Sequence, residues 1–210
     1  MRRDTSSKII SALEAFYGVV VPDLSFRNNY ELTVAVVLSA QTTDRQVNGV
    51  TVKLFGMYPD FASLASAGRS DVERIIKSTG FYRVKAANII ALAAAVMERF
   101  GGILPDNSAD LMELPGVGKK SANVILSIGF DKPALAVDTH VSRIAKRLGY
   151  TDELNPLMIE KDLCGVIPEQ DWKKTHLLFI KHGRSTCTAR NPRCEACAVS
   201  RWCRFFNPSA

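Results

Sequence analysis

Apolar side chains recur along most of the chain every three to four residues, which is the spacing of one face of an α-helix. Glycines that follow several of these runs, such as Gly18, Gly101 and Gly149, are typical helix ends. The pattern predicts an all-α fold. Its predicted helices cover residues 9–17, 47–55, 82–100, 107–113, 119–129, 139–148 and 171–182.

Three segments give less direct signals. Residues 30–38 alternate as a strand would, but no hairpin partner lies nearby, so we predict a helix there. Ser70-Asp-Val-Glu73 has the capping-box pattern and predicts a helix that Gly80 closes. Asn155-Pro156 predicts a helix start, and Gly183 predicts the end of the helix that begins at 171.

Composition narrows the class of protein. The chain has 210 residues, and its mean hydropathy is +0.02. No apolar run reaches the length of a membrane span, and no apolar segment follows the basic N-terminus as in a secretory signal. We therefore expect a soluble protein of the cytoplasm. The net charge of +6 is concentrated in residues 173–204, where eight basic residues face one acid, Glu195. This placement favours a polyanionic partner such as nucleic acid over a merely solvated tail.

Leu114-Pro-Gly-Val-Gly118 predicts a tight connector between two helices. Gly116 and Gly118 permit backbone conformations that other residues avoid, and the following helix would direct N–H groups at a phosphate. An ordinary helix–helix turn is the alternative. Lys119 and Lys120, directly after the turn, favour phosphate binding.

Two kinds of chemistry-bearing residue follow the connector. The helix dipole and any burial would lower the pKa of a lysine in the first turn, and a neutral amine can attack a sugar C1′. Spacing alone does not choose between Lys119 and Lys120. Asp138 precedes a helix and is predicted to be its N-cap.

Four cysteines within 17 residues, in a chain without a signal sequence, indicate a metal site rather than disulfides. Only one close pair is present, whereas structural zinc usually uses two, so a [4Fe-4S] cluster is favoured over zinc. A fifth cysteine, Cys164, is predicted to be a small buried hydrophobe. The four predicted ligands are Cys187, Cys194, Cys197 and Cys203.

These motifs together resemble the endonuclease III family of helix-hairpin-helix DNA glycosylases. The resemblance rests on residues 114–123 (LPGVGKKSAN), 136–140 (AVDTH), 38–44 (LSAQTTD), 78–82 (STGFY) and the cysteine spacing, and it covers nearly the whole chain. It implies two helical lobes with the active site in the cleft between them. A helical barrel domain would span 22–132, with the hairpin at about 107–129. A cluster domain would join 1–21 to 133–210, with the cluster loop at 187–203.

The resemblance also implies roles for individual residues. Lys120 would be the nucleophile, and Asp138 would stabilise positive charge on the sugar and help to keep Lys120 deprotonated. Lys119 would then contact phosphate. Met112 stands where relatives often carry a Glu tied to active-site water, which leaves the proton relay open.

Further residues would contact DNA. Gln41 would fill the space left by a flipped nucleotide, and Phe81 would wedge beside the unpaired base unless it only packs behind Gly80. His140 would line the base pocket or serve only the structure. Arg190 and Arg193, on a loop held by the cluster, would bind DNA phosphate.

The function implied is excision of oxidised or ring-damaged pyrimidines from double-stranded DNA, followed by cleavage of the abasic site by β-elimination. The alternatives are a glycosylase for uracil or mismatched thymine, and a non-enzymatic DNA-binding module with structural zinc. We expect a monomer, located in a prokaryotic cytoplasm and associated with the nucleoid through DNA.

Overall fold

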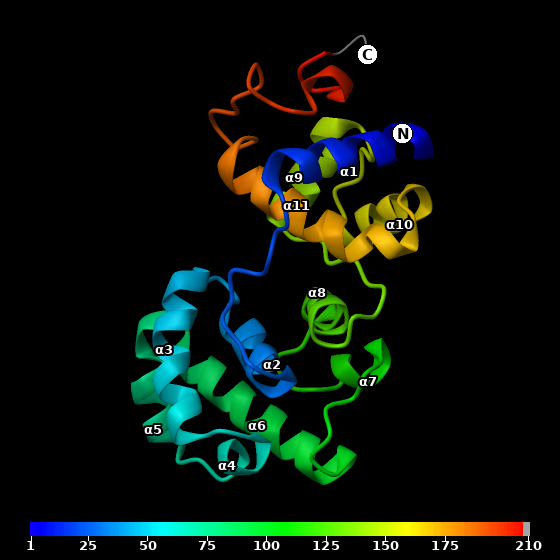
Figure 1. Cartoon of the computed structure of the whole chain (residues 1–210). Helices are drawn as coiled ribbons and strands as arrows, with labels where there is room; N and C mark the ends of the chain where they lie inside the picture. Colours follow the sequence, from blue (N-terminus) through cyan, green and yellow to red (C-terminus); the bar gives the residue numbers. More distant parts are fainter. Residues whose placement is uncertain (208–210) are drawn as a thin grey trace. The chain divides into compact units, whose positions relative to one another are not determined.

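The computed structural model describes residues 1–207, which form helices joined by loops, with no β-strand in that range (Figure 1). The prediction of an all-α protein is confirmed. The chain folds into two compact units. We call Pro22–Lys132 the middle unit, and Met1–Val21 together with the chain from Pro133 the terminal unit.

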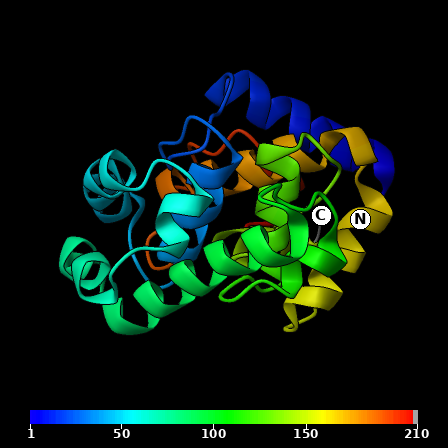
Figure 2. The same cartoon turned by 90° about the horizontal axis from the view of Figure 1, so that it is seen from below.

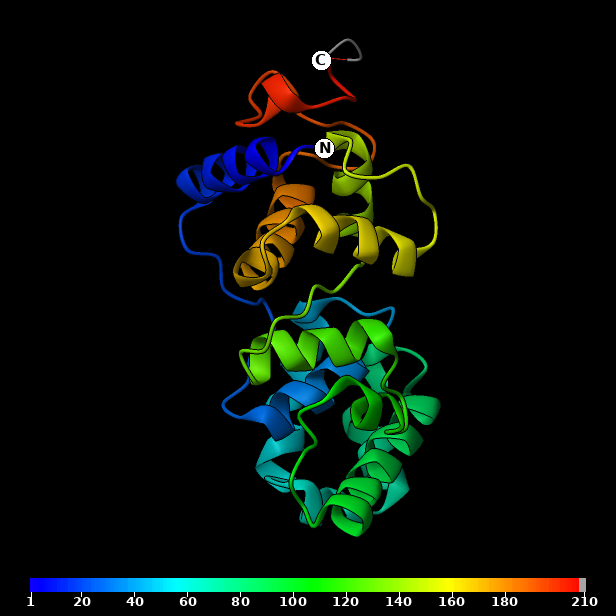
Figure 3. The same cartoon turned by 90° about the vertical axis from the view of Figure 1, so that its right-hand side faces the viewer.

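The middle unit is built around one long helix, α6, which runs the length of the unit (Figures 1 and 2). Helices α2, α4 and α5 contact it. A 3₁₀ turn, Lys77–Thr79, precedes α6, and a π-helical turn, Ile125–Gly129, continues α8 as one rod (Figure 3). The helices of this unit are α2 (Asn29–Leu38), α3 (Asp44–Met57), α4 (Phe61–Ala65), α5 (Arg69–Ile75), α6 (Tyr82–Phe100), α7 (Ser108–Met112) and α8 (Lys119–Val124).

Helix α2 explains why its sequence looks like a strand. Every residue from Tyr30 to Leu38 is buried, so this helix has no polar face that would show a period of 3.6 residues. Its start is nevertheless specified locally, because the Asn28 side chain accepts a hydrogen bond from the Glu31 N–H at 2.9 Å. The prediction of a helix is confirmed.

The start predicted at Ser70 is wrong. Helix α5 begins at Arg69 after Gly68 and ends at Ile75, before Gly80 is reached. The capping box of this region lies one helix earlier, where Asp60 and Ser63 each bond the other's backbone N–H. The capping-box pattern of residue types can therefore occur where no helix begins. Helix α5 has one buried residue, Val72, which packs it against the rest of the unit.

The terminal unit packs four helices around an apolar core. They are α1 (Arg3–Tyr17), α9 (Thr139–Leu148), α10 (Pro156–Val166) and α11 (Trp172–Ser185), with 3₁₀ turns at Glu169–Asp171 and Ser200–Trp202. Helix α11 contacts both α1 and α9. Core residues from these elements and from the cysteine loop include Leu13, Ile144, Phe179 and Val199. Cys164 of α10 packs against this core and is half-buried.

Gly183 does not end the helix, contrary to the prediction. Helix α11 continues to Ser185. A Cβ at Gly183 would lie 2.9 Å from Nη2 of Arg143 and 3.1 Å from Cβ of His140. The glycine therefore allows α9 and α11 to approach closely, which is a long-range requirement that the local sequence does not reveal.

Within residues 1–207, none of the helices combines the length and apolar character needed to cross a membrane.

Candidate active site and metal centre

The connector between α7 and α8 depends on Gly116. This residue has φ of +81°, and a Cβ there would lie 3.0 Å from Cγ1 of Val37 and 3.2 Å from Asn88. Both the left-handed backbone and the close approach to neighbouring helices disfavour any residue with a Cβ at this position. Leu114 is buried in front of it and anchors the connector to the core.

Gly118 plays a different part from the one predicted. Its φ of −96° is open to any residue, and a Cβ there would meet nothing within 4 Å. The expectation that Gly118 needs a conformation closed to other residues is therefore wrong. Gly118 is the N-cap of α8, and no side chain caps this helix. The N–H groups of the first turn are thus available for an external acceptor, as predicted for phosphate.

The two lysines occupy the first turn of α8. Lys120 is exposed and Lys119 is half-buried. Lys120 is therefore not a buried amine, and it lies at the uncapped N-terminus of α8, where it is accessible to a ligand.

Asp138 is the N-cap of α9, as predicted. Its Oδ1 accepts a hydrogen bond from the Val141 N–H at 2.8 Å. The preceding segment, 134–137, is buried and has no regular secondary structure, and it fixes where the carboxylate emerges. Since the cap uses one oxygen, Oδ2 remains a second acceptor. Asp138 belongs to the terminal unit and Lys120 to the middle unit.

His140 lies in the first turn of α9 and is half-buried. Its Nδ1 is 3.1 Å from Nη2 of Arg143, which also donates to the Gly183 carbonyl at 2.8 Å. Burial, together with the positive charges of Arg143 and Arg184, lowers the pKa of His140, while Asp138 acts in the opposite direction. The histidine is therefore held neutral near neutral pH.

Gln41 and Phe81 both have left-handed backbones, with φ of +53° and +46°. Non-glycine residues rarely adopt this conformation, and it is often found at functional sites. Gln41 is exposed, and the Phe81 side chain is 67% exposed, so Phe81 does not pack into the core behind Gly80. Met112, at the end of α7, is also exposed.

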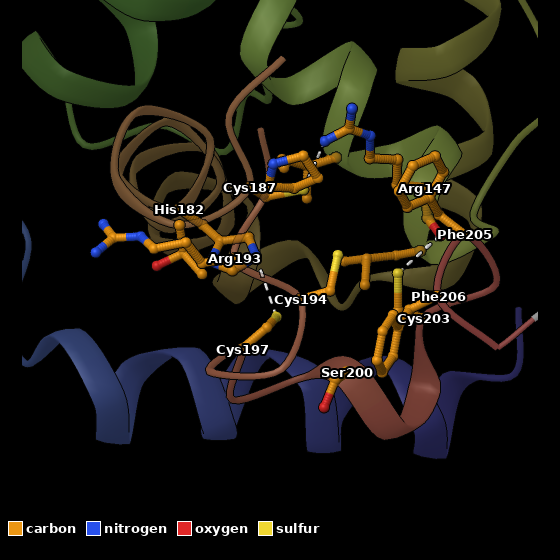
Figure 4. Close-up of a pocket in the computed structure, with 14 residues that line it drawn as sticks. Arg147, His182, Cys187, Arg193, Cys194, Cys197, Ser200, Cys203, Phe205 and Phe206 are labelled. Atoms are coloured by element: carbon orange, nitrogen blue, oxygen red, sulfur yellow. Dashed lines mark hydrogen bonds between the residues drawn. The ribbon is translucent and has the colours of Figure 1, made fainter. Parts of the chain in front are cut away.

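The four predicted ligands surround one pocket in the terminal unit (Figure 4). Cys187 follows α11, and Cys203 follows the last 3₁₀ turn, while Cys194 and Cys197 lie on the loop between them. The walls of this pocket also include Ile144, Leu148, Pro192, Phe205 and Phe206.

This arrangement fits an iron–sulfur cluster. In a [4Fe-4S] cluster each thiolate binds its own iron atom, so the ligands line a cavity instead of meeting at one point. Among residues 1–207, no three His, Cys, Asp or Glu side chains converge on the position of a single metal ion. Burial raises the pKa of the Cys194 and Cys197 thiols, and neighbouring cysteines add to this effect. Cys194 and Cys197 would therefore have to lose their thiol protons in order to hold a cluster.

Arg147 of α9 organises the loop and was missed by sequence reasoning. Its Nη1 donates to Sγ of Cys187 at 3.2 Å and to the Thr188 carbonyl at 2.8 Å, and its Nη2 donates to the Ala189 carbonyl at 2.9 Å. An arginine in the last turn of a helix is common for reasons of the helix dipole alone, so its sequence position carried no signal.

A second group missed by sequence reasoning connects Cys197 to α1. Nε2 of His182 lies 3.6 Å from Sγ of Cys197, and Nδ1 lies 2.8 Å from the hydroxyl of Tyr17. Tyr17 also contacts the Thr186 hydroxyl at 2.7 Å. Burial and Arg143 lower the pKa of His182 to about 4. These residues are distant in the sequence, and nothing in their spacing links them.

The two predicted phosphate-binding arginines differ. Arg190 is exposed, and within residues 1–207 no hydrogen bond or ion pair holds its side chain. Arg193 is also exposed, but its Nη2 donates to the Ser185 carbonyl at 2.6 Å and thereby closes the loop onto α11.

Two models of known protein families match this chain, one over its middle and one over the cysteine loop. Residues 34–169 match the model of the HhH-GPD superfamily of base excision DNA repair proteins. Residues 187–203 match the model of the iron–sulfur binding domain of endonuclease III. The chain belongs to the endonuclease III family.

Individual members of the endonuclease III family extend this match over the whole chain. Endonuclease III of Bacillus subtilis is 44% identical over 87% of this chain and 84% of its own length. That of Synechocystis is 40% identical over 96% of this chain and 93% of its own length. A solved structure of a trapped endonuclease III–DNA covalent intermediate is 38% identical, with a TM-score of 0.93 over 99% of this chain and 98% of that one.

Membership of the endonuclease III family establishes the class of protein. The chain is a base excision repair enzyme, a DNA glycosylase with abasic-site lyase activity, and it carries a [4Fe-4S] cluster. The zinc-binding alternative is thereby set aside. In this chain the cluster would be held by Cys187, Cys194, Cys197 and Cys203, where it joins separate parts of the loop.

Proposed function

We propose that this enzyme removes oxidised or ring-damaged pyrimidines from double-stranded DNA through a covalent intermediate on Lys120, and then cleaves the strand. The observation that carries this proposal is an exposed lysine in the first turn of α8, directly after a connector whose left-handed turn favours glycine at position 116. An amine in this position is accessible to a sugar, and backbone N–H groups beside it are available to a phosphate.

The first step replaces a C–N bond by another. The Lys120 amine, in its neutral form, attacks C1′, and the bond from C1′ to the damaged base breaks. The base leaves with the bonding electron pair and takes up a proton, while the amine loses one. Opening of the sugar ring then gives a Schiff base between Nζ and C1′.

The second step cuts the strand. Loss of a proton from C2′ of the Schiff base expels the phosphate from C3′, so the C3′–O bond breaks on the 3′ side of the abasic site. Hydrolysis then releases Lys120. A protonated Schiff base makes this elimination favourable because it withdraws electrons from C2′.

Asp138 would act as the charge-stabilising group. Its Oδ1 is engaged by the Val141 N–H, which fixes the carboxylate, and Oδ2 can face positive charge that develops on the sugar. The same carboxylate would act as the base that accepts the proton lost by Lys120. We propose that both residues act on one nucleotide.

A base inside the duplex cannot be reached, so the target nucleotide has to be flipped out. Three residues would stabilise the flipped state. The exposed Gln41 and Phe81 are suited to enter the stack, as filler and wedge. His140 would face the extruded base as a neutral imidazole that can donate or accept a hydrogen bond.

Phosphate contacts would fix the enzyme on the duplex without reading its sequence. The uncapped first turn of α8 offers N–H groups together with Lys119, and Gly116 and Gly118 keep side chains out of the approach. The exposed guanidinium groups of Arg190 and Arg193 would bind phosphate at the cluster loop. The cluster would hold this loop in place.

The substrate class is tested with a set of duplexes that carry one lesion each: an oxidised pyrimidine, a uracil, a mismatched thymine or an abasic site. We expect base release and strand cleavage with the oxidised pyrimidine, and cleavage alone with the abasic site. Excision of uracil or mismatched thymine in preference to oxidised pyrimidines would replace the proposed substrate. Absence of base release from every duplex would contradict glycosylase activity.

We also propose that the enzyme works in a prokaryotic cytoplasm at the nucleoid.

A further inference from the structure

A buried lysine of the middle unit has no part in the reaction described above. Lys85 lies in the first turn of α6 and is only 5% exposed. Burial lowers the pKa of its amine. Within residues 1–207 no carboxylate forms an ion pair with Lys85. A salt bridge therefore does not explain why a lysine is buried at this position.

Both acceptors of Lys85 come from other segments. Its Nζ donates to the Thr42 hydroxyl at 2.5 Å and to the Thr79 carbonyl at 2.9 Å. The Thr42 hydroxyl donates in turn to the same Thr79 carbonyl at 2.5 Å. The three groups form a closed triangle, which we call the Lys85 tie. It joins the loop after α2 to the 3₁₀ turn before α6.

The residues that the tie joins are close neighbours of Gln41 and Phe81, two of the three non-glycine residues with positive φ within residues 1–207. Gln41 immediately precedes Thr42, and the pair Gly80-Phe81 immediately follows Thr79. Gln41 and Phe81 have positive φ, and the Lys85 backbone N–H also bonds the Phe81 carbonyl at 3.1 Å. Strained backbone persists only where its surroundings fix it. In each loop, the tie lies one or two residues from the strained position.

We infer that Lys85 is a positioning residue that sets the spacing between Gln41 and Phe81, so that both enter the duplex in one register when the target nucleotide is flipped. The inference rests on the proposed function, because it needs Gln41 and Phe81 as the inserted pair. A lysine suits this role because it supplies several N–H donors on a long stem and can reach two loops at once. Preorganised loops avoid the cost of ordering on binding.

Two substitutions test the tie. Lys85→Met keeps an unbranched apolar stem and removes the donors, and Thr42→Val keeps the side-chain shape and removes the hydroxyl. Lys53→Met, at an exposed position on α3, is the matched control. Thermal unfolding and affinity for undamaged duplex are measured on all three variants. If Lys85→Met does not fold, Thr42→Val decides the question.

The readout is the ratio of two single-turnover rates: base excision from a duplex with an oxidised pyrimidine, and cleavage at a preformed abasic site. Excision requires a base to be extruded, whereas the abasic site has no base to unstack. We expect Lys85→Met to slow excision about 10- to 100-fold, the scale of a small misplacement, and to slow cleavage of the abasic site much less. Thr42→Val should show a smaller change in the same direction.

A purely structural role would lower both rates together through the amount of folded enzyme. Equal loss of both rates, or no loss in folded variants, would overturn the inference. A 2-aminopurine opposite the lesion gives an independent measure, because its fluorescence rises when it is unstacked by insertion. We expect a smaller rise with Lys85→Met than with Lys53→Met, and equal rises would contradict the tie. If the wild-type enzyme excises no base, the proposed function fails, while this fluorescence still tests the tie.

Discussion

The connector Leu114–Gly118 and the cysteine loop 187–203 both lack regular secondary structure over most of their length, yet they are held in opposite ways. The connector is shaped mainly by its own backbone, above all by Gly116 at φ of +81°, and from other helices it needs only a close fit against Val37 and Asn88. The cysteine loop is held by side chains from other helices. Arg147 of α9 bonds three of its groups, and His182 of α11 lies against Cys197.

This difference indicates why the two regions tolerate change differently. A turn whose shape rests mainly on a left-handed glycine can present an exposed nucleophile without a set of hydrogen bonds from the side chains of other helices. The loop has few helical residues and gains its order from arginine, buried imidazole and the cluster. Its stability should therefore depend on iron, whereas that of the connector should not.

The largest effect is expected at the connector. Lys120→Gln should lower the single-turnover rates of base release and of strand cleavage by at least about 1,000-fold, the scale seen when a catalytic nucleophile is removed. Lys119→Gln, the matched control, should keep most of both rates and lose affinity for undamaged duplex. Full activity of Lys120→Gln with loss of activity in Lys119→Gln would reverse the assignment.

At the cysteine loop, Cys203→Ala should remove the visible absorption of the cluster and destabilise the terminal unit. We expect a loss of at least about 2 kcal/mol, which for a chain of this size lowers the melting temperature by roughly 4–8 °C. Cys164→Ala is the control, since Cys164 lies on α10, outside the loop. A Cys203→Ala protein that keeps full absorption and stability would show that this thiol is not a ligand.

Gly116→Ala and Gly118→Ala compare a connector glycine that has a left-handed backbone with one that does not. Gly116→Ala should destabilise the protein by about 1–3 kcal/mol, because it combines a left-handed backbone with contacts to Val37 and Asn88. Gly118→Ala should cost only about 0.5 kcal/mol, the preference of an N-cap for Gly over Ala. Chemical denaturation measures both, and equal losses would mean that the connector is not fixed by Gly116.

The smallest effect is expected from the arginines of the loop. Arg190→Ala should weaken binding to all duplexes alike and reduce the slope of log K against log salt by about 0.9, the value for one phosphate contact. Arg193→Ala should do the same and also destabilise the loop, because it loses the bond to the Ser185 carbonyl. Arg3→Ala, on α1, is the control. An unchanged slope for Arg190→Ala would contradict its contact with phosphate.

The sequence predicts those features that depend on neighbouring residues. The helix ends at Gly101 and Gly149 are of this kind, and so is the N-cap Asp138. The sequence does not predict features that depend on a contact with a residue far away in the chain. Gly183 looks like a helix end but accommodates α9, and Ser70 has a capping pattern that α5 does not use.

The candidate site divides in the same way. The cysteines and the lysines stand out because their types and spacing carry chemistry. Arg147, His182 and Lys85 do not, because an arginine, a histidine or a lysine in a helix is ordinary until its partners are known. Their roles follow from contacts with residues that lie tens of positions away or on a different element.

The most direct test of the account is to trap the covalent intermediate and locate it. The wild-type enzyme is incubated with a duplex that carries an oxidised pyrimidine, borohydride reduces the Schiff base, and mass spectrometry maps the modified peptide. We expect an adduct on Lys120 in the wild-type protein and in Lys119→Gln, and no adduct in Lys120→Gln. Attachment at Lys119 or elsewhere, or strand cleavage by the wild-type protein without any trapped adduct, would contradict it.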